Sequence, residues 1–495
     1  MKERKAGILL PVFSLWGEYG IGSMGSEARA FLRSVKNAGF KVWQVLPLTP
    51  TGYGDSPYQA ECGYAGNPYF IDLPTLKKQG LLTEEELLSA RVENTGRVDY
   101  TWLYETRLNL LKKAFSRFVP TPEYRKFAAQ KKFRDYALFT ALKAEKNGLP
   151  WYDWEAELRF RRPLALRLAR NRNRQQINFY LFVQYEFFRQ WYSLKEYANG
   201  LGVQILGDLP LYLSRDSVEG WVHPELFLLG ENRAPELVAG VPPDYFDENG
   251  QLWGNPVYDW EAQAKTGYRW WRNRIRDNLT LFDMLRIDHF RGLDRYYAVP
   301  ANAENAKNGK WYDGPKTALF RGMKSAPIVA EDLGTSDDSL VAFLKKSGYP
   351  GMRVLSFMFD GDPKNPHLIS NHAINSVVYT GTHDNQPLLQ LYLQGDSKER
   401  AAMRNILAVQ CKKRGIACEK RLGGRYFVGR ANALLLNSRS RLAILPFFDV
   451  LLRADLRVNT PGTSDGNNWT ARLKKTDWKS AYLRRVKAEI ERADR

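Results

Sequence analysis

Eight short apolar runs, each ending in polar residues, Pro or Gly, constrain the fold of this chain more than any other feature. Runs that are apolar throughout are typical of strands covered on both faces, and helical periodicity lies between them, as in 26–38 and 337–346. Eight strand-and-helix units of this kind predict an α/β fold, a (β/α)₈ TIM barrel. The runs begin at Ala6, Lys41, Val203, Asp283, Pro327, Met352, Ser376 and Leu442.

The spacing between the runs predicts large insertions. Residues 47–202 separate the second run from the third, whereas a plain strand-helix-strand crossover needs about thirty residues. We therefore expect 1–495 to form a single catalytic barrel with a mainly helical subdomain, 53–200, inserted on its C-terminal face. A second insertion is expected in 230–260, because 240–256 is rich in Gly, Pro and aromatic residues and has little periodicity; it should be a long loop that acts as a lid.

Composition limits the class of protein. The 495 residues include 14 Trp and 26 Tyr, whose flat rings can pack in a core or stack on sugar faces. The formal net charge is +19, but the densest basic run, 159–174, contains no nucleic-acid module and fits one solvated helix face, so we expect no specific nucleic-acid partner. Cys62, Cys411 and Cys418 form no disulfide framework, and no run of 18 apolar residues could span a membrane; we expect a cytoplasmic protein without a membrane partner.

The fourth apolar run ends in a charged cluster, D-M-L-R-I-D-H-F-R-G in 283–292. Side chains two residues apart on a strand point to the same side, so Arg286 can hydrogen-bond Asp288 and keep it ionised. That arrangement suits a nucleophilic carboxylate, and an internal ion pair at a strand end is the alternative.

Other runs also end in polar residues. Barrel enzymes place their chemistry at the C-terminal ends of the strands, and closure of the barrel brings those ends to one mouth. Carboxylates crowded there raise one another's proton affinity, which suits glycoside chemistry: one carboxylate attacks the anomeric carbon and a protonated one donates to the leaving oxygen. The strand-end residues are Asp208, Arg286, Asp288, Glu331, Asp332, His383 and Asp384.

Several common catalytic motifs are missing from the sequence. H-E-x-x-H, a P-loop, G-x-G-x-x-G after a strand and G-x-S-x-G do not occur, which argues against the usual zinc, phosphoryl-transfer, nicotinamide and serine-hydrolase enzymes. A Mg²⁺ or Ca²⁺ site stays open, because clustered carboxylates bind these ions. Arg286 would compete with a cation there, so we expect neither a metal nor a cofactor; the candidate ligands would be Asp208, Asp288, Glu331 and Asp384.

Ordered motifs along nearly the whole chain resemble the 4-α-glucanotransferases (amylomaltases or disproportionating enzymes), which form family 77 of the glycoside hydrolases and are relatives of the α-amylases. The resemblance implies transfer of α-1,4-glucan segments between glucans and maltooligosaccharides by a retaining double displacement through a covalent glucosyl-enzyme intermediate, without a cofactor. The motifs are T-G-Y-G-D-S-P-Y-Q at Thr51, G-N-P-Y at Gly66, G-D-L-P-L-Y at Gly207, H-P-E-L-F at His223, G-V-P-P-D-Y-F at Gly240, W-G-N-P at Trp253, R-I-D-H-F-R-G at Arg286, A-E-D-L-G at Ala330, T-H-D-N at Thr382 and N-T-P-G-T at Asn459.

The resemblance also implies residue roles. Asp288 matches the nucleophile, Glu331 the general acid/base, and Asp384 the carboxylate that grips the hydroxyls of the donor sugar. Retaining chemistry predicts that the carboxyl groups of Asp288 and Glu331 lie roughly 5 Å apart. Substrate-binding roles are implied for Arg286, which would hold Asp288, for Asp208, which would support Arg286, and for His383, Tyr53, Ser56, Tyr58, Trp253, Asp360 and Asn459. For the aromatic residues among them, packing within their loops is the alternative.

Two segments depart from the family pattern. The family usually has Gln-Asp after Pro-Leu near the eighth strand, whereas Pro446, Phe447 and Phe448 precede Asp449 here, and 394–430 matches only loosely. We therefore assign no acceptor-side residue in these segments.

Two other functions remain open at this point: an amylase-like α-1,4-glucan hydrolase would use the same carboxylates, and a non-catalytic glucan-binding protein would explain the aromatic residues.

Overall fold

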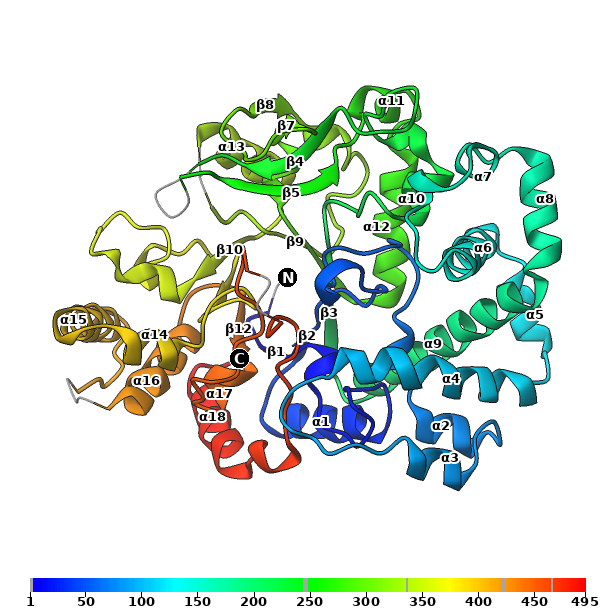
Figure 1. The fold of residues 1–495 in the computed structure, drawn as a ribbon. Helices are drawn as coiled ribbons and strands as arrows, with labels where there is room; N and C mark the ends of the chain where they lie inside the picture. The colour runs from blue at the N-terminus through cyan, green and yellow to red at the C-terminus, as the bar shows by residue number, and fades with distance from the viewer. Residues whose placement is uncertain (1–2, 244–247, 335–336, 420–422, 464–465) are drawn as a thin grey trace.

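The protein is a closed barrel of eight parallel strands surrounded by helices (Figure 1). The computed structural model describes residues 3–243, 248–334, 337–419, 423–463 and 466–495, except for the side chains of Tyr53 and Ser480. The strand order around the barrel is β1-β12-β11-β10-β9-β6-β3-β2, so the predicted TIM barrel is confirmed. Each strand coincides with one of the eight predicted runs: β1 Lys5–Leu9, β2 Val42–Gln44, β3 Gln204–Leu209, β6 Met284–Ile287, β9 Ile328–Ala330, β10 Gly351–Val354, β11 Ser376–Tyr379 and β12 Leu442–Pro446.

Most residues of the barrel strands are buried, which explains why their sequences are mostly apolar. Every residue of β2, β6, β9, β11 and β12 is buried. The helices predicted in 26–38 and 337–346 are present as α1 and α13. The helices outside the β2–β3 insertion are α1 Ser26–Asn37, α10 Val218–Val222, α11 Trp260–Lys265, α12 Arg269–Leu281, α13 Asp338–Ser347, α14 Leu388–Gln394, α15 Ser397–Lys413, α16 Gly424–Leu436, α17 Phe447–Val450 and α18 Ser480–Arg492.

Eight helices lie between β2 and β3, to the right and below the barrel in Figure 1. Two helices rather than one cover 122–145, because the chain turns between Ala128 and Lys131. The basic run 159–174 is divided too: Pro163 begins a new helix, where its missing N–H costs no hydrogen bond. The helices are α2 Leu73–Lys78, α3 Glu84–Ser89, α4 Tyr100–Arg117, α5 Pro122–Ala128, α6 Lys131–Glu145, α7 Ala156–Arg159, α8 Pro163–Arg172 and α9 Arg174–Gly200.

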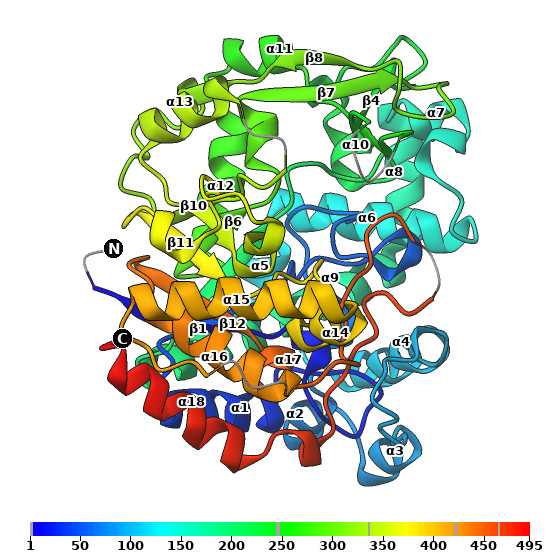
Figure 2. The ribbon, with the colours of Figure 1, turned by 90° about the vertical axis from the view of Figure 1, so that its left-hand side faces the viewer.

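A four-stranded antiparallel sheet lies beside the barrel, above it in both Figure 1 and Figure 2. It corrects the prediction that 240–256 is a loop: both ends of that segment are strands, and 244–247 lie outside the described residues. The pattern was hidden because only part of the second strand is buried, and because the first strand also pairs with a third strand that is distant in sequence. The order is β5-β4-β7-β8, with β4 Leu237–Val241, β5 Gln251–Pro256, β7 Arg295–Pro300 and β8 Lys310–Asp313.

Across the described ranges, every helix is too short or too polar to cross a lipid bilayer.

Gly207 provides a test of the packing around β3. A Cβ atom at this position would lie 2.1 Å from Cδ2 of the buried Phe282 ring. We expect Gly207→Ala to lower the free energy of unfolding by about 1–3 kcal/mol, because the ring or the strand must move. Urea denaturation followed by circular dichroism measures this change.

Gly200→Ala is the matched control, because a Cβ there meets no atom within 4 Å at the exposed end of α9. This variant should be as stable as the unmodified protein or slightly more stable. Equal losses in the two variants would contradict the packing of Phe282 on β3.

Candidate active site

The site is built on three neighbouring barrel strands, β3, β6 and β9. Asp208 and Arg286 are directly opposite each other in the β3–β6 register, and both side chains are buried. The Arg286 Nη1 donates to both carboxylate oxygens of Asp208 at 2.7 Å. Its Nη2 lies 2.9 Å from Oδ1 of Asp288, two residues further along the same chain. One guanidinium therefore bridges two carboxylates, and the contact with Asp288 is the one that the Arg-x-Asp spacing predicts.

Glu331 comes directly after β9 and lies beside Asp288. Its Oε2 accepts a hydrogen bond of 2.7 Å from the backbone N–H of His289, the residue that follows Asp288. Its Oε1 accepts a second bond of 2.7 Å from the backbone N–H of Leu333. The side chain of Glu331 is held by the backbone on both oxygens and is nearly buried.

Burial raises, and the charge of Arg286 lowers, the proton affinity of both carboxyl groups. Burial, opposed by the charge of Arg286, raises the pKa of Glu331. Burial and the nearby acidic groups Asp208 and Glu331 raise the pKa of Asp288 as well, and Arg286 opposes that rise. Two such groups beside one cation share a proton. The direct contact with Arg286, and the 26% exposure of the Asp288 side chain, favour the anion on Asp288 and the proton on Glu331.

His383 and Asp384 lie in the loop after β11. Nε2 of His383 is 3.4 Å from Oδ1 of Asp384, which also accepts a bond of 2.6 Å from Nδ2 of Asn459. Burial lowers the pKa of His383, so its ring is neutral at neutral pH. The ring stacks on Tyr58, with centroids 5.0 Å apart and planes 8° apart. The Tyr58 hydroxyl donates to Oδ2 of Asp208 at 2.8 Å, which connects this loop to the Arg286 cluster.

A cavity of about 800 Å³ opens at these strand ends. This volume lies within the range of about 300–1,000 Å³ that small-molecule sites occupy. The wall of the cavity includes Ser56, Asp288, Asp384 and Asn459. Glu331 lies behind the wall, where it is hydrogen-bonded to the wall residue His289. The rings on the wall are those of Tyr58, Tyr100, Tyr212, Trp253, His289, His383 and Trp469.

The structure does not place two of the sequence-predicted residues in this group. Asp360 is exposed at the end of the 3₁₀ helix Leu355–Asp360, where its carboxylate accepts bonds from the backbone N–H of Asp362 and from Asn365, and it is not on the cavity wall. The side chain of Tyr53 lies outside what the structure describes.

Sequence reasoning missed several residues of the cavity wall. His289 has a left-handed backbone with φ of 47°, and its ring packs edge-on against Trp253 with centroids 4.8 Å apart. Burial, with a smaller effect of Arg291, lowers the pKa of His289 to about 4, so this ring is neutral. Trp469 packs behind Tyr58, at 5.6 Å between ring centroids. The position of His289 next to Asp288 was a usable signal, whereas nothing in the sequence places Trp469 near Tyr58.

No group of three or more His, Cys, Asp or Glu side chains in the described ranges is arranged to hold a metal ion. The carboxylates Asp208 and Asp288 are already bonded to the Arg286 guanidinium, which occupies the position that a cation would take. The chemistry available at the site is therefore that of a carboxylate anion, a buried carboxyl group and two neutral imidazoles.

A (β/α)₈ barrel whose mouth holds an arginine-bound carboxylate beside a second, buried carboxyl group defines a class of protein: the barrel enzymes that act on glycosidic bonds. The sequence profile of one family, described as 4-alpha-glucanotransferase, matches residues 10–477. The chain belongs to this 4-alpha-glucanotransferase family.

Individual relatives agree with this assignment. The 4-alpha-glucanotransferase of Thermus thermophilus is 42% identical over 507 aligned residues, which cover 99% of both chains. That of Synechocystis sp. is 39% identical over 502 residues, covering 98% of this chain and 97% of the relative. The structure of an amylomaltase from Streptococcus agalactiae in complex with acarbose is 33% identical, has a TM-score of 0.94 and covers 100% of both chains.

Removal of Asp208 tests the buried ion cluster. We expect Asp208→Ala to lower the free energy of unfolding by about 3 kcal/mol, because Arg286 then keeps only one of its two carboxylate partners in a buried position. Chemical denaturation measures the loss. Asp313→Ala, which removes an exposed partner of Lys316, is the control and should have little effect. Equal stabilities of the two variants would contradict the arrangement of the cluster.

Proposed function

We propose that this protein is a 4-α-glucanotransferase that transfers α-1,4-glucan segments from a donor glucan to an acceptor glucan. One observation carries the proposal: Arg286 holds Asp288 at the mouth of a barrel, with the buried carboxyl group of Glu331 on the next strand. Membership of the 4-alpha-glucanotransferase family supports the same reaction. The substrates are α-1,4-glucans and maltooligosaccharides; no cofactor, nucleic acid or membrane is needed.

The first half of the proposed reaction breaks the donor. A carboxylate oxygen of Asp288 attacks the anomeric carbon, and the bond from that carbon to the leaving oxygen breaks. Glu331 gives its proton to the leaving oxygen, so the shortened glucan departs with a free 4-hydroxyl group. Arg286 keeps the attacking group ionised until the new bond forms.

The second half returns the glucosyl unit to a sugar. Glu331, now ionised, takes the proton from the 4-hydroxyl of an acceptor glucan, and that oxygen attacks the anomeric carbon on the face opposite to Asp288. The bond from the anomeric carbon to Asp288 breaks in the same step, which restores the Asp288 carboxylate and the protonated Glu331. Two displacements retain the configuration of the anomeric carbon. We expect Asp384 and His383 to bond hydroxyls of the donor sugar. Their side chains lie 3.4 Å apart, and Nδ2 of Asn459 donates to Asp384.

Whether water or sugar accepts the glucosyl unit depends on how well an acceptor excludes water from the cavity. Trp253, on strand β5, supplies an aromatic ring on the cavity wall, packed against His289. We propose that residues 230–260 act as the lid at this side, and that 53–200 is an inserted subdomain which presents Ser56 and Tyr58 to the glucan. The three cysteines are free, in keeping with a reducing compartment such as the cytoplasm.

Incubation with maltotriose tests the proposed function. A transferase should give glucose together with longer oligomers and little gain in reducing ends. A hydrolase would instead release reducing ends steadily and form no longer oligomers. We expect Asp288→Asn to lower kcat for transfer by at least about 10³-fold, because the amide cannot form the covalent intermediate. Chromatography of the products and a reducing-end assay measure both results.

Asp313→Asn is the matched control, because this exposed aspartate lies outside the cavity wall and the substitution should leave transfer unchanged. Retained glucan binding by Asp288→Asn, measured by calorimetry, separates loss of chemistry from loss of fold. Full transfer activity in Asp288→Asn would disprove the proposed mechanism, and binding without any turnover in the unmodified protein would indicate a glucan-binding protein.

A further inference from the structure

A buried carboxylate that the reaction does not use lies just after β12. Asp449, on α17, is 1% exposed. Its Oδ2 accepts a hydrogen bond of 2.5 Å from the hydroxyl of Thr380, and its Oδ1 accepts one of 2.9 Å from the backbone N–H of Leu388. Within the described part of the chain no cationic side chain pairs with it, and burial raises the pKa of Asp449 to about 7. An acidic group in this environment needs an explanation.

The two partners of Asp449 are the two ends of one loop. Thr380 directly follows β11, and Leu388 is the first residue of α14. Between them lie 381–387, which include His383 and Asp384. The two oxygens of one carboxylate therefore tie the entry and the exit of the loop that carries the donor-sugar residues.

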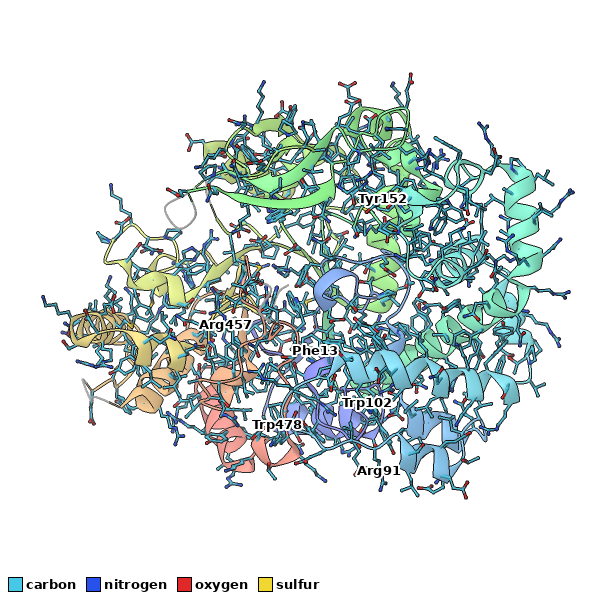
Figure 3. All side chains as sticks on the ribbon, in the orientation of Figure 1. Phe13, Arg91, Trp102, Tyr152, Arg457 and Trp478 are labelled. Atoms are coloured by element: carbon cyan, nitrogen blue, oxygen red, sulfur yellow. The ribbon has the colours of Figure 1, made fainter. Side chains whose placement is uncertain are left out.

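Other bonds hold the tip of the same loop. The Asn385 Oδ1 accepts bonds from the backbone N–H of Thr382 at 2.8 Å and from its hydroxyl at 3.0 Å. Arg457, labelled in Figure 3, donates from Nη2 to the backbone oxygen of Asp384 at 3.4 Å. Tip and base are held by different groups, so the base can be loosened while the contacts of the tip remain.

The position of Asp449 is itself held. Its backbone oxygen accepts a bond of 3.0 Å from Nδ2 of Asn432, which is a buried residue of α16. The backbone of Asp449 is thus bonded to α16, and its carboxylate is bonded to both ends of the loop.

We propose that Asp449 is a positioning residue that sets the location of Asp384 and His383 relative to Asp288 by closing the 381–387 loop at its base. The inference rests on the proposed function, because the loop must grip the donor sugar for its position to affect the rate. Small displacements of a group that acts in the transition state lower kcat more than they weaken ground-state binding.

Asp449→Asn is the most selective test. The amide oxygen can still accept from Leu388, but the NH₂ group cannot accept the hydrogen of the Thr380 hydroxyl, so only a weaker bond, donated by the NH₂ group to the hydroxyl oxygen, can replace the original one. We expect kcat for maltotriose transfer to fall about 10- to 100-fold while KM changes little. Thr380→Val removes the same bond from the other side and should give a similar loss. The double variant should lose little more than either single one, because both remove one interaction.

Asp72→Asn is the matched control. Asp72 is 2% exposed and accepts bonds from Ser23 and Thr75, but it caps α2, outside the catalytic cavity. It should lose stability and keep its kcat. If Asp449→Asn and Thr380→Val also keep their kcat and lose only stability, the positioning role is overturned while the proposed function stands. If the unmodified protein performs no transfer, both the proposed function and this inference are overturned.

Discussion

The site depends on the contact between the Arg286 guanidinium and the two carboxylates of Asp208 and Asp288. Three charges lie together at the mouth of a barrel whose strands are mostly apolar, and removing one of them would leave a neighbour buried without its partner. The cation keeps the attacking group charged, and its attraction to Asp288 leaves the shared proton on Glu331. Nucleophile and acid are thus assigned mainly by the direct contact of one carboxyl group with Arg286, and also by the greater exposure of Asp288.

The barrel makes this contact possible, because parallel closure places strand ends side by side that are far apart in sequence. Asp208 and Arg286 are opposite residues in the β3–β6 register, although 77 residues lie between them along the chain. Loops complete the site around these rigid strands. The segment after β11 presents His383 and Asp384, and β5 brings an aromatic ring from the neighbouring sheet.

Much of this arrangement could be predicted from the sequence, because the barrel strands are buried on both faces and their apolar runs need no tertiary context. The strand-end carboxylates followed from the same runs. The sheet of β4, β5, β7 and β8 could not be predicted, because its partly exposed strands have no distinctive pattern and pair across two separate insertions. His289 could have been inferred from its place next to Asp288, although its left-handed backbone could not. The wall position of Trp469 depends on a contact between distant loops, which has no local signal.

The acidic limb of the pH dependence of kcat/KM for maltotriose tests the central claim most directly, because it reports the ionisation of Asp288 in the free enzyme. The charge of Arg286 opposes the rise that burial causes in the pKa of Asp288. Replacement of Arg286 by Gln should therefore raise this pKa further, which moves the limb to higher pH, and should also reduce the rate. A limb that stays at the same pH in Arg286→Gln would show that the guanidinium does not control the charge of the attacking group.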